Sequence, residues 1–173
     1  MSLPDGLATL RALAGLPIFI ALGNDRRDLA LGIFVAAALS DALDGWLARR
    51  TGTTTDHGAI LDPLADKALV LSTLAGLTLV GAAPFALAAA ITIREALVTG
   101  LRVVRYRAGE PMPATPAAKL KTALEMCAIA ILIVMRPPGN EATVGVALLA
   151  AALAIGIVTL PMYVPRKRHR FIA

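Results

Sequence analysis

The chain has 173 residues, of which 57% are hydrophobic and only 17% charged, and its mean hydropathy is +0.72. About a quarter of the residues of a soluble domain are usually charged, so this composition argues against an ordinary soluble domain and predicts an integral membrane protein. The formal net charge is +5. The basic residues flank apolar runs and form no nucleic-acid-reading motif, so the expected partner is anionic lipid and not nucleic acid.

Six apolar runs approach the roughly 20 residues that a helix needs to cross a bilayer. In chain order they occupy residues 7–22, 28–47, 59–80, 85–104, 117–135 and 143–164. Short connections rich in glycine, proline and polar residues separate them, and none of these is long enough to form a second domain. We therefore expect one all-α domain over residues 1–173, built as a bundle of six transmembrane helices.

Basic residues are unevenly distributed between the two sides of this predicted bundle. The second and fourth connections and the C-terminal tail are basic, whereas the other side carries only Arg26, Arg27 and Arg136. Lysine and arginine accumulate on the cytoplasmic side of membrane proteins. We therefore expect a multi-pass protein of the cell membrane with both termini in the cytoplasm. Tyr163 and Trp46, near predicted helix ends, are expected to be interfacial anchors.

Four aspartates lie in the second and third apolar runs, near the ends predicted to face the cytoplasm. Asp41 and Asp44 share one helix face because they are three residues apart, and Asp62 and Asp66 share one because they are four apart. A carboxylate inside a bilayer costs roughly 2.5 to 3.5 kcal/mol, and several together repel unless cations neutralise them. Oxygen ligands suit Mg²⁺ or Mn²⁺. The pattern predicts a divalent-metal site, and acids solvated by lipid headgroups are the alternative.

The residues between these aspartates complete a longer pattern. From Asp41 to Asp66 the sequence reads D-x2-D-G-x2-A-R-x8-G-x3-D-x3-D. This pattern resembles the signature of the CDP-alcohol phosphotransferase family. The resemblance implies a six-helix membrane enzyme that uses two divalent ions, transfers a phosphoalcohol from a CDP-alcohol to an acceptor hydroxyl and releases CMP.

The resemblance also implies roles for the motif residues. The implied metal ligands are Asp41, Asp44, Asp62 and Asp66. Asp66 is also implied to be the general base that takes the proton of the acceptor. The implied donor-binding residues, which would hold the CDP group, are Asp41, Gly45, Ala48, Arg49 and Gly58. From their residue types alone, the small Gly45 and Ala48 would leave a shallow groove, although small residues also serve helix packing, and the cationic Arg49 suits a phosphate.

Other segments are similar to the bacterial phosphatidylglycerophosphate synthase subgroup of that family. They are LPDGLATLRALAGLP at residues 3–17, DPLADK at 62–67, IREALVTGLR at 93–102 and AKLKTALEM at 118–126. This similarity implies CDP-diacylglycerol as the donor and glycerol 3-phosphate as the acceptor, and the family resemblance implies a homodimer. The alternatives are a cardiolipin synthase with phosphatidylglycerol as acceptor, a phosphatidylinositol-phosphate synthase and, from another class, a cation transporter.

Basic residues in the fourth and fifth runs are candidates for binding the phosphate of the acceptor. They are Arg94, Arg102, Lys119 and Lys121. Cations inside a bundle need anionic partners, and a phosphorylated acceptor would be one. The alternative for Arg94 is pairing with Glu125 or an aspartate, and for Arg102 and Lys121 it is snorkelling to headgroups. Lys67 is expected to pair within the aspartate cluster.

Overall fold

The computed structural model describes residues 3–51, 58–107, 109, 115–135 and 140–163. The side chains of residues 3–9, 41–42, 44–51, 58–66 and 140–142 lie outside this description. The described ranges contain six α-helices, one short 3-10 helix and no strand. The helices are α1 (Leu3–Gly23), α2 (Arg27–Thr51), α3 (Gly58–Leu79), α4 (Phe85–Arg107), α5 (Pro116–Val134), α6 (Asn140–Val158) and the 3-10 helix η1 (Leu160–Tyr163). The predicted all-α, six-helix architecture is confirmed.

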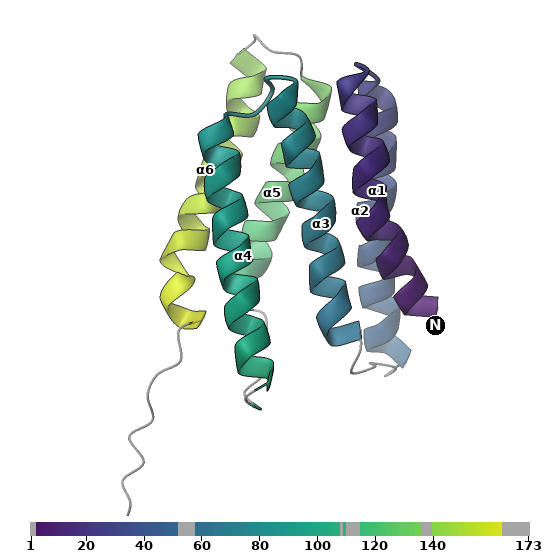
Figure 1. The fold of residues 1–173 in the computed structure, drawn as a ribbon, viewed down its shortest axis with the longest axis vertical. Coiled ribbons are helices and arrows are strands. Elements are labelled where there is room, and N and C mark those ends of the chain that lie inside the picture. Colours follow the sequence, from purple (N-terminus) through teal and green to yellow (C-terminus); the bar gives the residue numbers. More distant parts are fainter. Residues whose placement is uncertain (1–2, 52–57, 108, 110–114, 136–139, 164–173) are drawn as a thin grey trace, which may run out of the picture.

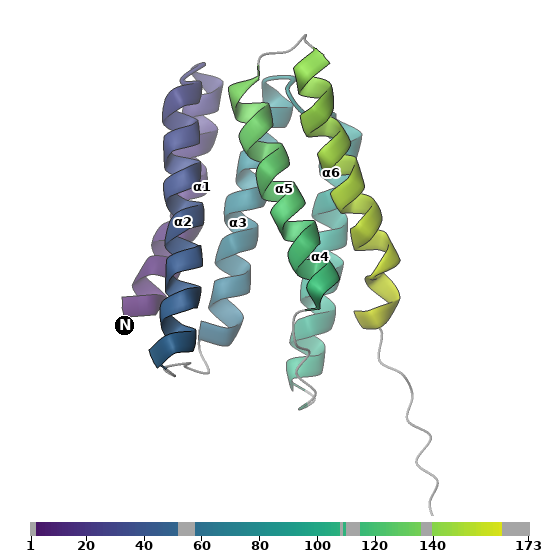
Figure 2. The ribbon, with the colours of Figure 1, turned by 180° about the vertical axis from the view of Figure 1, so that it is seen from behind.

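The six α-helices run up and down in a single bundle (Figures 1 and 2). α1 packs against α2 and α3, α5 packs against α6, α2 and α3, and α4 packs against α3 and α6. α2, α4 and α6 end at the same end of the bundle, and α1, α3 and α5 begin there (Figure 1). We call this the aspartate end, because the motif positions of α2 and α3 lie toward it.

Two of the helix boundaries follow directly from local sequence. After α3, Gly81 has a φ of 73°, a left-handed conformation that glycine adopts without steric cost and that commonly ends a helix. Before α5, the side chain of Thr115 accepts a hydrogen bond of 3.2 Å from the backbone N–H of Ala118. Pro116 then starts the helix, where its missing N–H costs nothing. Both breaks lie in connections that the sequence predicted, after the run that ends at residue 80 and before the run that begins at residue 117.

The end of the sixth helix differs from the prediction. The sequence pattern predicted a helix to residue 164, but α6 ends at Val158 and η1 follows. Pro161 has no backbone N–H to donate, and its ring clashes with the preceding turn of a continuing α-helix. The 3-10 turn leaves Tyr163 only 3% exposed. The prediction that Tyr163 is an interfacial anchor is therefore wrong.

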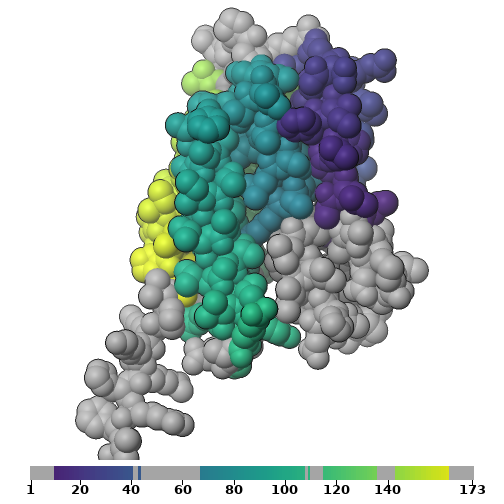
Figure 3. Space-filling model, in the orientation of Figure 1, coloured from purple at the N-terminus to yellow at the C-terminus, as the bar shows by residue number. Residues whose placement is uncertain are grey.

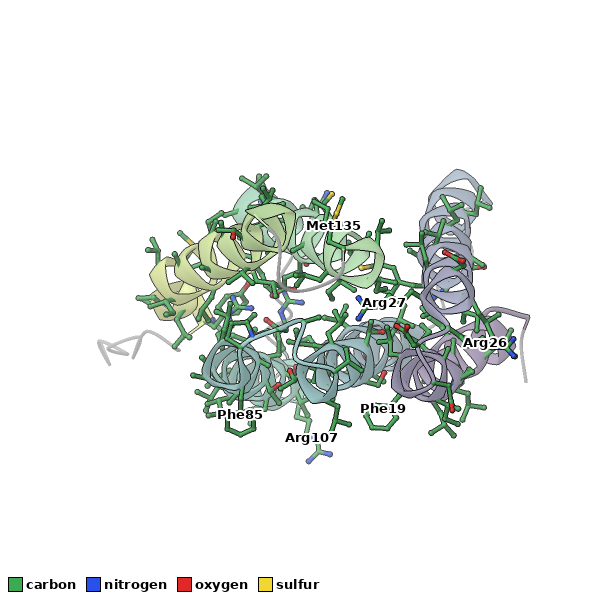
Figure 4. The ribbon with its side chains drawn as sticks, turned by 90° about the horizontal axis from the view of Figure 1, so that it is seen from above. Phe19, Arg26, Arg27, Phe85, Arg107 and Met135 are labelled. Carbon is green, nitrogen blue, oxygen red and sulfur yellow. The ribbon has the colours of Figure 1, made fainter. Side chains whose placement is uncertain are left out.

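The interior of the bundle is aliphatic, and much of its outer surface is apolar as well. The largest fully buried apolar side chains are Ile18, Leu22, Leu69, Leu74, Leu77, Ile91, Ile129, Leu132, Ile133 and Leu149. On the outside, Leu79, Phe85 and Val158 are 71%, 77% and 76% exposed. Phe19 and Phe85 point away from the bundle on the same side as Arg107 (Figure 4). Over the part of the chain that the structure describes, no helix combines the length and the apolarity needed to cross a membrane.

Arg27 joins two helices at the end opposite the aspartates. Its Nη1 donates to the backbone carbonyl oxygens of Met135 at 3.0 Å and Ile133 at 3.4 Å, and its Nε donates to Asp25 at 3.1 Å. A cation near a helix C-terminus satisfies carbonyl groups that have no partner within the helix. Arg27 therefore fastens the start of α2 to the end of α5, whereas Arg26 points away from the bundle (Figure 4).

Candidate active site

The motif aspartates occupy two helices that meet the same end of the bundle. Positions 41 and 44 lie in α2, and positions 62 and 66 lie in α3. α2 runs toward the aspartate end and α3 runs away from it (Figure 1). The predicted helical spacing of each pair is thus confirmed at the level of the backbone. The side chains of Asp41, Asp44, Gly45, Ala48, Arg49, Gly58, Asp62 and Asp66 lie outside the described residues, so their predicted roles stay predictions.

Further along α3, α4 and α5, charged side chains form a buried network centred on Glu95. Its Oε2 accepts from Lys67 Nζ at 3.2 Å, and its Oε1 accepts from Lys121 Nζ at 2.6 Å and from Arg94 Nη1. Lys121 also pairs with Glu125 Oε2 at 2.7 Å. We call these five residues the Glu95 network. Three cations therefore face two carboxylates, in a region where an uncompensated charge is costly.

The network answers what the sequence left open about Arg94. All three nitrogens of its guanidinium donate hydrogen bonds, to Glu95, to the carbonyl oxygen of Gly156 at 3.2 Å and to Thr159 Oγ1 at 3.4 Å. Gly156 makes room for this arrangement, because an added Cβ there would lie 2.9 Å from Arg94 Nε. Among the described side chains, the carboxylate partner of Arg94 is thus Glu95 and not Glu125.

Two further predictions change in the same way. Lys67 was expected to pair within the aspartate cluster. Among the described side chains, its Nζ bonds Glu95 and the Thr99 hydroxyl of α4, and the aspartates lie outside that description. Lys121 was a candidate for the acceptor phosphate or for snorkelling to headgroups. Its side chain is 5% exposed and bridges Glu95 and Glu125, so it does not snorkel. The charges of Lys121 and Arg94 already have carboxylate partners, which weakens their candidacy for the acceptor site.

The other two predicted acceptor-binding residues, Arg102 and Lys119, have no carboxylate partner among the described residues, so their charge is available to bind an anion. Arg102 donates a 3.4 Å hydrogen bond from Nη2 to the hydroxyl of Tyr163, and its Cζ lies 5.3 Å from the centre of that ring. Arg102 Nε is buried without a hydrogen-bond partner, and no carboxylate of the described residues pairs with this arginine. Lys119 is exposed in the first turn of α5. Arg102 and Lys119 are therefore the stronger candidates for binding an anion.

A groove of about 580 Å³ runs between α3 and α4 beside the Glu95 network. Figure 3 shows this face of the molecule, with α3 and α4 side by side. The groove is lined by Lys67, Ala68, Leu71, Glu95, Ala96, Thr99, Gly100, Val103 and Val104. Most of these side chains are small or apolar, so the buried charges of the network border an apolar surface.

A family model described as CDP-alcohol phosphatidyltransferase matches residues 1–158, which include the whole aspartate motif. The chain belongs to the CDP-alcohol phosphatidyltransferase family. The family resemblance of the 41–66 motif is thereby confirmed. Membership supports the reaction class expected from the motif, since the family model takes its name from that transfer.

Curated members of the CDP-alcohol phosphatidyltransferase family show how far this similarity extends. A Mycobacterium tuberculosis protein named probable phosphatidylglycerophosphate synthase is 36% identical over 167 aligned residues, which cover 92% of this chain and 79% of the relative. A Bacillus subtilis CDP-diacylglycerol--glycerol-3-phosphate 3-phosphatidyltransferase is 38% identical over 106 aligned residues, which cover 61% of this chain and 55% of the relative. A cardiolipin synthase (CMP-forming) of Oryza sativa is 33% identical over an alignment of 195 residues, which covers 99% of this chain and 59% of the relative. The relatives thus carry names of two activities.

Glu95 is the residue of the site that sequence reasoning missed. It follows Arg94 directly in an otherwise apolar stretch of α4. Two adjacent opposite charges in such a stretch were a usable signal, because buried charges are nearly always paired. The identity of its partners on α3 and α5 depends on tertiary packing and is not visible in the local pattern.

Proposed function

We propose that this chain transfers the phosphatidyl group of CDP-diacylglycerol to glycerol 3-phosphate and releases phosphatidylglycerophosphate and CMP. Family membership supports the transfer chemistry, and the relatives named for this reaction support the donor and the acceptor. The observation that favours a phosphorylated acceptor is Arg102, whose guanidinium has a buried nitrogen without a partner and no carboxylate beside it among the described residues. The Oryza sativa relative makes cardiolipin synthesis the second candidate.

The metal site belongs to this proposal. Four carboxylates on two helices that meet the same end of the bundle are a donor set suited to two Mg²⁺ or Mn²⁺ ions. The proposed ligands are Asp41, Asp44, Asp62 and Asp66, and the proposed donor-binding residues are Asp41, Gly45, Ala48, Arg49 and Gly58. Such ions would neutralise negative charge on the leaving CMP. Asp66 would accept the proton of the attacking hydroxyl.

Soaking crystals in Mn²⁺ should give anomalous density among Asp41, Asp44, Asp62 and Asp66. Closely spaced carboxylates cannot all stay ionised without neighbouring cations, so the ions should bind even before the substrates. A crystal of the Asp62→Asn variant, soaked in the same way, should show weaker density at this position. Density found only at other acidic residues, such as Asp28 in the first turn of α2, would contradict the proposed site.

We also propose that the bundle lies in the cell membrane with its termini and its aspartate end toward the cytoplasm. The exposed leucine, valine and phenylalanine side chains along the helices support a lipid environment. Arg105 and Arg107 in the last turn of α4, and Lys119 in the first turn of α5, support the orientation. A homodimer, implied by the family resemblance, stays a prediction.

The acceptor can be tested by measuring CMP release from CDP-diacylglycerol. We expect glycerol 3-phosphate to support CMP release far better than glycerol, serine, inositol or phosphatidylglycerol. Replacing Arg102 or Lys119 with alanine should raise KM for glycerol 3-phosphate and leave KM for the donor nearly unchanged. A charge-assisted hydrogen bond contributes roughly 1.5 to 3 kcal/mol, so the increase in KM should be about tenfold or more.

The matched control is Arg26→Ala, which removes an exposed arginine at the opposite end of the bundle. This variant should keep the KM of the parent for both substrates. If phosphatidylglycerol proves the better acceptor, the chain is a cardiolipin synthase. If Arg102→Ala and Lys119→Ala both behave like the parent, the acceptor phosphate binds elsewhere.

A further inference from the structure

Tyr163 contacts two arginines of α4 with a single buried ring. It ends η1 and is 3% exposed. The Cζ atoms of Arg94 and Arg102 lie 5.9 Å and 5.3 Å from the centre of its ring. These arginines are about two helical turns apart on α4. At both distances a guanidinium is attracted to the aromatic ring.

The two arginines differ in what else holds them. Arg94 uses all its nitrogens on Glu95, Gly156 and Thr159, so its position does not depend on Tyr163. Among the described residues, the only hydrogen bond of Arg102 goes to the Tyr163 hydroxyl, at 3.4 Å. Its Nε is buried without a partner. Within the described side chains, Tyr163 is therefore the residue that fixes the guanidinium of Arg102.

We propose that Tyr163 is a positioning residue that holds Arg102 ready to bind the phosphate of the acceptor, an inference that rests on the proposed function. Arginine has a flexible side chain, and ordering it during binding costs free energy. A guanidinium already held against an aromatic face avoids part of that cost. The nitrogens that Tyr163 leaves unused can then donate to the phosphate oxygens, often as a pair.

The test compares Tyr163→Leu, which removes the ring, with Tyr163→Phe, which keeps the ring and removes the hydroxyl. We expect Tyr163→Leu to raise KM for glycerol 3-phosphate roughly tenfold, the scale of a partly desolvated cation–π contact. KM for CDP-diacylglycerol and kcat should change little. Tyr163→Phe should lie much closer to the parent. Tyr106→Leu, at the 40% exposed tyrosine of α4, is the matched control and should behave like the parent.

A double-mutant cycle separates positioning from simple structural support. If Tyr163 acts through Arg102, Tyr163→Leu should have little further effect in an Arg102→Ala background. An equal rise in KM in both backgrounds would overturn the inference. A Tyr163→Phe variant that is as impaired as Tyr163→Leu would overturn its cation–π basis and leave the hydroxyl as the group that holds Arg102. Because Tyr163→Phe keeps the buried ring, it remains informative even if Tyr163→Leu does not fold.

Calorimetric binding of glycerol 3-phosphate without donor separates this inference from the proposed function. In one outcome, the parent binds glycerol 3-phosphate and Tyr163→Leu weakens this binding, but no CMP is released. The proposed function then fails and the positioning role stands. If the parent releases CMP with glycerol 3-phosphate and Tyr163→Leu leaves KM unchanged, the positioning role fails alone. If the parent neither binds nor uses glycerol 3-phosphate, both fail.

Discussion

Replacing Asp66 with asparagine should reduce the rate of CMP release by roughly 100-fold or more, the scale of a lost general base. Asparagine has almost the same shape but cannot take the proton of the attacking hydroxyl at neutral pH. Donor binding should weaken much less, because three other carboxylates are proposed to hold the ions that bind the pyrophosphate. The measurements are single-turnover rates and equilibrium binding of CDP-diacylglycerol in the presence of Mg²⁺.

Asp28→Asn is the matched control for this change, because Asp28 is an exposed acid in the first turn of α2, at the other end of the bundle. It should keep the rate of the parent. The opposite pattern at Asp66, in which donor binding is lost and the residual rate is high, would place the base on another residue.

The helices were predictable because local sequence determines most of them. Apolar runs of the right length are separated by residues that stop or start a helix, such as Gly81 with its positive φ and Pro116 in the first turn of α5. The helical spacing of the two aspartate pairs follows from the same local rule. The exception was α6, where Pro161 is also visible in the sequence but lies within a long apolar run that the prediction continued to residue 164.

The pairing of charges was not predictable to the same degree. Lys67 lies next to Asp66 in the sequence, yet its side chain reaches Glu95 on α4. Lys121 reaches the same carboxylate from α5. Such contacts depend on how three helices are rotated about their axes, and helical periodicity gives only which residues share a face. The sequence therefore identified the cations but not the carboxylate that holds three of them together.

Glu95→Gln should destabilise the bundle more than any other single change in the network. Glutamine keeps the size of the side chain and removes the charge that Lys67, Arg94 and Lys121 share. Three cations would then face only one carboxylate within the network. Breaking a buried ion pair by removing one partner costs roughly 3 to 5 kcal/mol, because the remaining charge stays buried. The loss should appear as a lower midpoint of chemical and thermal unfolding in a fixed detergent.

Glu125→Gln is the matched control, because it makes the same chemical change at a carboxylate that, among the described residues, pairs with Lys121 alone and whose Oε1 has no hydrogen-bond partner. It should cost clearly less, since Lys121 would keep Glu95. Adding Lys67→Met to Glu95→Gln should restore part of the lost stability, because Glu95 is the carboxylate that pairs with Lys67 among the described residues, and the double variant has one unpaired cation fewer. If Glu125→Gln costs as much as Glu95→Gln, or if Lys67→Met gives no recovery, the three cations do not depend on Glu95 as their common partner.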